Sequence, residues 1–94
     1  GNCDCPNRNR FIQNNFEEVS GETLDEVREA ASDDESRCLS ACVRMGEARG
    51  DFFETDDIIN CTWSAHETSV DPGDPWSEAN DAIMISCAFV FCLD

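Results

Sequence analysis

The stretch AIMISCAFVFCL, residues 82–93, is the longest apolar run in the chain and decides between two folds. Within it, Ile83 to Val90 is apolar enough for a buried strand, which its β-branched residues favour. Asp74-Pro75 upstream favours a helix instead, because this pair has the form of an N-cap followed by proline at the first helical position, where the missing amide proton costs nothing. We expect the helix, since its start signal is strong and no second strand is evident for pairing. Its apolar face would carry Trp76, Ala79, Ile83, Cys87 and Val90.

Helical periodicity is also found in the first half of the chain. From Asn9 onward, one helical stripe is formed by Phe11, Ile12, Phe16 and Val19, and Ser20-Gly21 ends it. Residues 23–26 have the form of a capping box and begin a second helix that carries Leu24, Val27 and Ala31. Residues 32–35 repeat this pattern and lead into a third helix that carries Cys38, Leu39, Cys42 and Met45, with Gly46 as its stop.

Thr55, followed by two aspartates, opens a short fourth helix with Ile58, Ile59, Cys61 and Thr62. Residues 64–73 are rich in Ser, Thr, Asp and Gly and are expected to form a loop. No repeat or long linker divides the chain, so residues 1–94 form one domain. The sequence therefore predicts an all-α fold, a small disulfide-stapled bundle of four to five helices.

The charge of this chain excludes several classes of partner. It has 21 acidic residues against six basic ones, a formal net charge of −15, and all six basic residues are arginine. Such a surface repels phosphate backbones and anionic lipid heads, so we expect no nucleic-acid partner. No run of 18 apolar residues is present, so we expect no membrane insertion. The chain begins at Gly1 without methionine, which we interpret as a processed mature form, so a missing signal peptide does not argue against secretion.

Seven cysteines lie at positions 3, 5, 38, 42, 61, 87 and 92. Paired C-x-x-C spacings typical of zinc sites are missing, and the only histidine is His66, so no metal and no cofactor are expected. A redox motif at a helix start is missing as well. A disulfide framework in an oxidising compartment remains, with Cys38 and Cys42 joining one helix to two different elements. The pairing we expect is Cys5 with Cys42, Cys38 with Cys92 and Cys61 with Cys87, which leaves Cys3 unpaired.

Other residues suggest binding rather than catalysis. Trp63 and Trp76 are candidate contacts to a protein partner, with core packing as the alternative for each. Asn60 begins a glycosylation sequon whose access would be poor if Cys61 were bridged. Ser64, His66 and Glu67 are neighbours in sequence, whereas catalytic groups are normally brought together by the fold. We find no organised acid and base, and expect no enzyme.

Two families resemble this sequence. NCDCPNRN, the CLSAC segment and the lack of lysine are similar to the water-borne mating pheromones of ciliates, which are secreted, disulfide-linked helical bundles. RCLSACV and DPGDPWSEANDAIMISC are similar to insect odorant-binding proteins, with Trp76 where that family has a cysteine. The gap between Cys42 and Cys61 is shorter than that second family requires.

These resemblances imply a secreted, extracellular binding protein. The expected function is signalling of the pheromone type, by binding a cell-surface receptor protein, with a homo-oligomer as a further mode of association. The alternatives are a carrier of a small hydrophobic ligand, as in the odorant-binding family, and a secreted inhibitor or effector.

Overall fold

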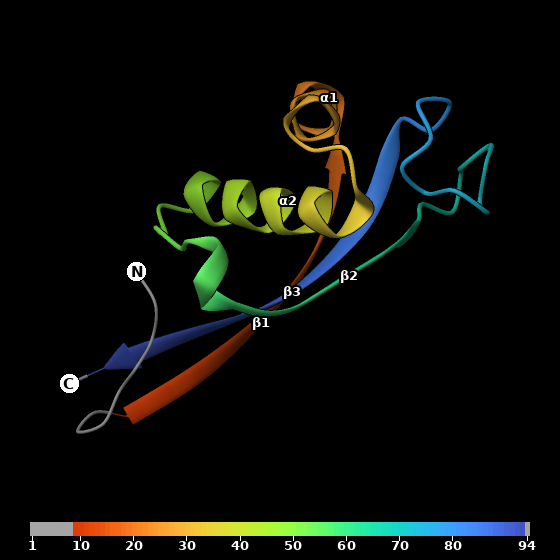
Figure 1. Cartoon of the computed structure of the whole chain (residues 1–94). Coiled ribbons are helices and arrows are strands. Elements are labelled where there is room, and N and C mark those ends of the chain that lie inside the picture. The colour runs from red at the N-terminus through yellow and green to blue at the C-terminus, as the bar shows by residue number, and fades with distance from the viewer. Residues whose placement is uncertain (1–8, 94) are drawn as a thin grey trace.

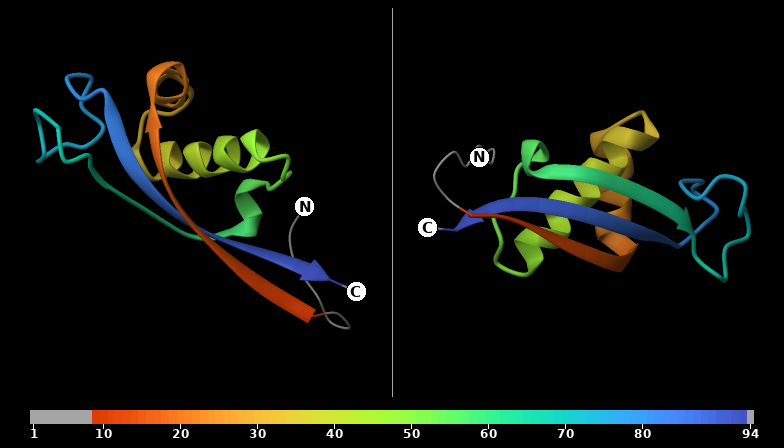
Figure 2. Two further views of the ribbon diagram at one scale, coloured as in Figure 1. Left: turned by 180° about the vertical axis from the view of Figure 1, so that it is seen from behind. Right: turned by 90° about the horizontal axis from the view of Figure 1, so that it is seen from below.

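The computed structural model describes residues 9–93. Three antiparallel strands form one sheet in the order β1-β3-β2, with β1 at Asn9–Ser20, β2 at Ile58–Ala65 and β3 at Ala82–Leu93. Two helices, α1 at Gly21–Ala30 and α2 at Asp34–Ala48, cover one face of this sheet (Figure 1; Figure 2). The fold is therefore mixed α/β in two layers, and the prediction of an all-α bundle is wrong.

The apolar stretch at residues 82–93 is the central strand β3 rather than a helix. It pairs with β1 from Asn9↔Leu93 to Ser20↔Ala82, and with β2 on its other side. β3 therefore has a partner strand on each side. The lack of an evident second strand was the reason for expecting a helix at this position, and that reason no longer holds. The Asp74-Pro75 pair belongs to a turn instead, in which the Ser77 amide donates a hydrogen bond to the Asp74 carbonyl.

Residues 9–20 form the edge strand β1, so the predicted first helix is also wrong. In a strand, alternate side chains lie on opposite faces. Val19 lies on the helix-covered face and is buried, whereas Phe16 and Ile12 lie on the other face and are exposed. The helical stripe seen in the sequence is thus divided between the two faces of the sheet.

The two helices lie close to the predicted second and third ones. Asp33, rather than Ser32, is the N-cap of α2, and its carboxylate accepts hydrogen bonds from the amide and the hydroxyl of Ser36, each at 2.8 Å. Gly46 does not end α2: it lies within the helix where a Cβ atom would come within 3.2 Å of the Phe53 ring. The chain leaves the helix through Gly50, whose φ of 85° is a left-handed conformation that favours glycine.

The predicted fourth helix is reduced to one 3-10 turn, η1 at Thr55–Asp57. The buried Asp57 carboxylate accepts a hydrogen bond from the Glu54 amide at 2.8 Å, within a capping box. The chain then becomes the strand β2, with a register shift between Ile58 and Asn60. Along β2, Cys61 and Trp63 pack against the core, whereas Thr62 between them is exposed, which is the alternation of a strand.

A loop at residues 66–81 connects β2 to β3 and is held by two polar side chains. Asn80 is buried, and its amide group accepts hydrogen bonds from the amides of Val70 and Asp71 and donates to the Asp71 and Asp74 carbonyls. Arg28 of α1 donates to three carbonyls at 2.7 to 3.1 Å, those of Trp76, Ser77 and Asn80. The loop is therefore fastened to the end of α1.

The core lies between the helices and the covered face of the sheet. Its fully buried side chains include Leu24 and Val27 of α1, and Ile83, Ile85 and Phe89 of β3. No helix within residues 9–93 has the length and apolar character needed to cross a membrane.

Candidate functional site

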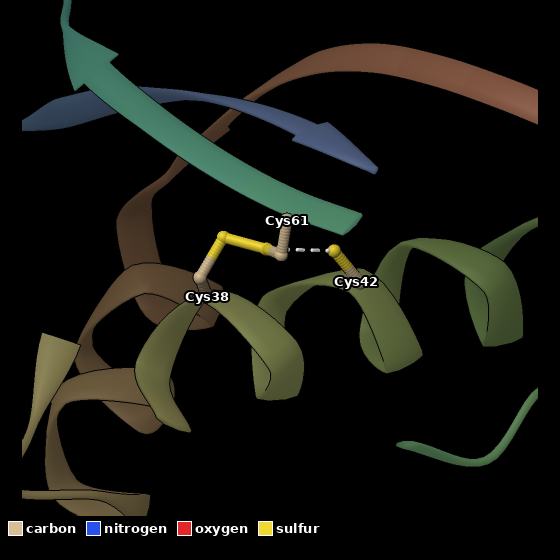
Figure 3. A group of neighbouring side chains, drawn as sticks. All are labelled: Cys38, Cys42 and Cys61. Atoms are coloured by element: carbon tan, nitrogen blue, oxygen red, sulfur yellow. Dashed lines mark hydrogen bonds between the residues drawn. A yellow bond between two sulfur atoms is a disulfide. The ribbon is translucent and has the colours of Figure 1, made fainter. Parts of the chain in front are cut away.

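Two disulfides join α2 to the sheet. Cys38 is bonded to Cys61 of β2 (Figure 3), and Cys42 is bonded to Cys87 of β3. The Cα–Cα distance is 6.0 Å in each bridge. Cys92 is disulfide-bonded too, and the structure describes no free cysteine in residues 9–93. The prediction that Cys38 and Cys42 join one helix to two different elements is confirmed.

The expected pairing within this framework was wrong. Cys38 is not bonded to Cys92, because Cys87 and Cys92 are five residues apart on β3, and an odd separation places them on opposite faces of the sheet. Cys61 and Cys87 are directly opposed in the sheet, yet each is bonded to α2 rather than to the other. Cys42 is bonded to Cys87, not to Cys5. Cys3 and Cys5 themselves lie outside the described residues.

The sulfur atoms of this region form a compact group, which we call the cysteine cluster: Cys38, Cys42, Cys61 and Cys87. The Sγ atoms of Cys42 and Cys61, which belong to different disulfides, are 3.2 Å apart (Figure 3). Those of Cys38, Cys42 and Cys61 all lie within 4.8 Å of one another. Sequence spacing gave no sign of this arrangement, because the four cysteines come from three separate elements.

The edge strand β1 is the second unusual feature. It pairs with β3 along one side over all 12 of its residues, and no strand in the described part of the chain pairs with its other side. Ile12 is 56% exposed and Phe16 is 64% exposed on the face away from the helices. The paired ends of β1 and β3 extend beyond the helices as a two-stranded ribbon (Figure 1), where the Phe11 and Phe91 rings stack at 5.6 Å.

None of the 21 acidic residues lies within residues 9–16, and Arg10 is the only charged residue there. The strands β2 and β3 lack acidic residues as well, so this half of β1 belongs to a sheet of low charge in a strongly acidic chain. We call residues 9–16, with their exposed Ile12 and Phe16, the β1 patch. Helical periodicity concealed it in the sequence, although its lack of acidic residues was visible.

An open groove of about 550 Å³ lies where β1, α1 and α2 meet. Four of its lining residues are Glu17, Glu18, Glu26 and Glu47. Arg44 also lines it and forms an ion pair with Glu26 at 2.8 Å, and Arg49 nearby pairs with Glu17 at 2.9 Å. Carboxylates at this density suit water and cations better than an apolar molecule.

The two tryptophans, predicted as contacts to a protein partner, both pack in or against the core. Trp76 is only 2% exposed, so it belongs to the core and is unavailable to a partner, which corrects its proposed contact role. Trp63 is half-buried, packs against the core, and its ring centroid is 6.3 Å from that of Trp76.

Asn60 is exposed on β2, next to the bridged Cys61, so its side chain is accessible although its neighbour is cross-linked.

His66 is engaged on both ring nitrogens. Nε2 lies 2.7 Å from a carboxylate oxygen of Glu18, and Nδ1 lies 2.8 Å from the Thr68 hydroxyl. This network links the end of β2 to β1 and serves to position the loop. Ser64 lies on β2, and no hydrogen bond between it and His66 occurs among the described contacts.

No protein-family model matches this chain, and comparisons with curated proteins and with solved structures found no match either. The features of this chain that bear on function are therefore the β1 patch, the cysteine cluster and the distribution of charge.

Proposed function

We propose that this protein is a secreted signal that acts by contact, binding a cell-surface receptor protein through the β1 patch. The observation that carries the proposal is an edge strand of 12 residues that exposes Ile12 and Phe16 and has one side unpaired within the described chain. An unpaired strand edge offers a row of amide and carbonyl groups to a strand of another protein. Strand addition of this kind is a common mode of peptide and protein recognition.

Charge supports the same surface. The 21 carboxylates discourage nonspecific association with most acidic proteins and membranes, whereas residues 9–16 carry no acidic side chain. A partner therefore meets little charge repulsion at the β1 patch. Exposed aromatic and aliphatic side chains there would supply the buried apolar contacts that dominate interface energy.

Disulfides support the extracellular location. Bridges between α2 and the sheet form and persist in oxidising compartments, and they are consistent with secretion. The ciliate-pheromone resemblance implies a helical bundle, so it does not account for the proposed use of the β1 patch. We keep from it only the proposed role, a secreted signal read by a receptor.

The carrier alternative receives less support. A carrier of a small hydrophobic ligand needs an enclosed, mostly apolar pocket. The groove of about 550 Å³ at β1, α1 and α2 is open and lined by four glutamates. A hydrophobic ligand bound there would remove water from these carboxylates, which costs free energy.

Binding can be measured with the oxidised full chain. Because the sequence has no lysine, an amine-reactive dye labels only the α-amino group. We expect saturable binding to the surface of cells from the source organism, and binding at least about tenfold weaker for Phe16→Ser, since one aromatic hot spot is typically worth more than 1.4 kcal/mol.

Phe52→Ser is the matched control, because Phe52 is 86% exposed and lies outside β1. It is expected to bind like the unmodified protein. Absence of saturable binding, or equal binding by the Phe16 and Phe52 variants, contradicts the proposal. Sedimentation of the unlabelled protein tests whether a second copy of this chain occupies the patch instead. If the protein is a dimer that Phe16→Ser dissociates, and no cell binding is seen, the edge of β1 binds a second copy and not a receptor.

A further inference from the structure

We propose that the cysteine cluster is a metal site in the reduced protein, in which Cys38, Cys42, Cys61 and Cys87 bind one zinc-like divalent ion through four thiolates. The proposal is independent of receptor binding, because it depends only on the positions of these four sulfurs. A metal was not expected from the sequence, because the cysteines lack the paired spacings of zinc motifs. The proposed site is instead formed by the fold.

The geometry of the four residues suits a tetrahedral ion. Cys38 and Cys42 lie one turn apart on α2 and share a face. Cys61 and Cys87 are opposite one another on adjacent strands, and both point toward α2. Two ligands from a helix therefore face two ligands from a sheet, and together they supply the four thiolates of a tetrahedral site.

The distances are close to those that the ion would impose. A zinc–sulfur bond of about 2.3 Å in tetrahedral geometry places the sulfurs about 3.8 Å apart. The Sγ atoms of Cys38, Cys42 and Cys61 lie within 4.8 Å of one another, with Cys42 and Cys61 at 3.2 Å. Cys87 lies outside this group of three, but its sulfur is bonded to that of Cys42, so it would have to move toward Cys38 and Cys61 to complete the site. Small side-chain rotations would then complete the site once the disulfides are opened.

Burial protects the site but leaves one entrance. Cys38, Cys42 and Cys87 are at most 1% exposed, whereas Cys61 is only partly buried. Cys61 also lines an open groove of about 250 Å³, together with Glu35, Leu39 and Asn60. Through this groove a thiol reductant, and then a cation, would reach the sulfur of Cys61 first.

Reduction by a monothiol RSH, of the glutathione class, would proceed in balanced steps. Two RSH reduce the Cys38–Cys61 bond to two cysteine thiols and form one RSSR. The Cys61 thiolate then attacks Cys42 Sγ at 3.2 Å, forms a Cys42–Cys61 bond and releases Cys87 as a thiolate that takes a proton. Two further RSH reduce the new bond and form a second RSSR. Four thiols result, and a divalent ion that binds them displaces their four protons.

The test uses the full chain with Cys3→Ser, Cys5→Ser and Cys92→Ser, so that only the cysteine cluster remains. The protein is reduced with dithiothreitol, freed of reductant under nitrogen, and titrated with Co²⁺ and then Zn²⁺. We expect one ion per chain, strong sulfur-to-cobalt absorption with the visible bands of a tetrahedral centre, and displacement of cobalt by zinc. Circular dichroism and amide NMR should show the mixed α/β fold in the metal-bound state.

Single variants in this background separate a designed site from adventitious binding by thiols. Cys38→Ser and Cys61→Ser should each lose the four-thiolate spectrum, whereas Ser40→Ala, on α2 between the two helical cysteines, should keep it. If the reduced chain unfolds without metal and refolds when zinc is added, the site is supported. The proposal is overturned if fewer than four thiolates bind the ion, or if the ion binds a chain that stays unfolded.

Discussion

Arg28 shows how much one residue contributes to this small fold. Its guanidinium is largely buried and donates to three carbonyls of the loop that precedes β3. Arginine suits this position because its donors form a planar fork, whereas the lysine ammonium is a compact charge on a flexible stem. The residue therefore fastens the loop at residues 66–81 to α1 and fixes where the central strand begins.

Replacing this residue with lysine tests that role. Arg28→Lys should lower the free energy of unfolding by about 2 kcal/mol, because hydrogen bonds made by charged groups are worth about 1.5–3 kcal/mol and lysine cannot satisfy all three carbonyls. Urea unfolding of the oxidised protein measures the effect. Arg10→Lys, at an exposed position of β1, is the control and should change stability by less than about 0.5 kcal/mol. Equal effects of the two substitutions would remove the proposed fastening role.

Asp33 predicts a dependence of stability on pH. The hydrogen bond from the Ser36 amide, and then that from the Ser36 hydroxyl, lower the pKa of this carboxyl below its ordinary value of 3.8. Because the folded pKa is the lower one, the stabilisation is complete above 3.8 and is lost as the pH falls through the folded value. In unfolding measurements from neutral to acidic pH, Asp33→Asn should lack this loss, since asparagine caps helices without titrating. Identical pH profiles for both proteins would show that Asp33 does not contribute.

At the scale of the element, β1 distinguishes a strand from a helix by mutation. In a helix, Phe16 and Val19 would share one face, whereas in β1 they lie on opposite faces. Val19→Ser should cost about 2 kcal/mol or more, since Val19 is buried, and Phe16→Ser less than about 1 kcal/mol. Chemical denaturation of the two variants gives the comparison. Similar large losses for both would favour the helical interpretation of residues 9–20.

The elements that the sequence predicted are those with local signals. The helix α2 has a short-range cap, the Asp33 carboxylate with Ser36, whereas α1 begins after Ser20 without a side-chain capping bond and shows only the helical spacing of Leu24 and Val27. Both helices lie near their expected positions. The strands depend on partners far along the chain: Asn9 pairs with Leu93, and Ser20 with Ala82. Residues 83–90 were recognised as a possible strand, but the partner strand that they needed, residues 9–20, had the periodicity of a helix. A wrong interpretation of residues 9–20 therefore led to the wrong one for residues 82–93.

The same distinction applies to the candidate sites. A disulfide framework was predictable from the number of cysteines. The four-residue spacing of Cys38 and Cys42 also predicted that α2 is joined to two different elements. The pairing was not predictable, because it depends on the register of β2 and β3. The β1 patch was missed for a related reason, since only knowledge of the sheet order shows that β1 lies at an edge.

For the whole molecule, stability should depend on which bridge is removed. Cys42–Cys87 closes a sequence separation of 45 residues and Cys38–Cys61 one of 23. Chain entropy then predicts losses of about 4 and about 3 kcal/mol for the double alanine variants, because the longer loop is more constrained in the unfolded state. Thermal and urea unfolding under nonreducing conditions measure both. A larger loss for the Cys38 and Cys61 pair would show that native packing, and not loop length, sets the difference.

The antiparallel pairing of β1 with β3 has a mechanical consequence. Asn9 and Leu93 are direct partners, so a force that pulls these two residues apart opens the ladder one pair at a time, from that end toward Ser20 and Ala82. The covalent ties between α2 and strands β2 and β3 carry no load during this peeling. The test uses a Cys92→Ser variant, because Cys92 is disulfide-bonded next to the pulled end and its bridge would otherwise bear the load. In an optical trap with handles at residues 9 and 93 of this variant, β1 should unzip at low force. The extension should then rise much less with force once the load reaches the part of the chain held by the two disulfides of α2.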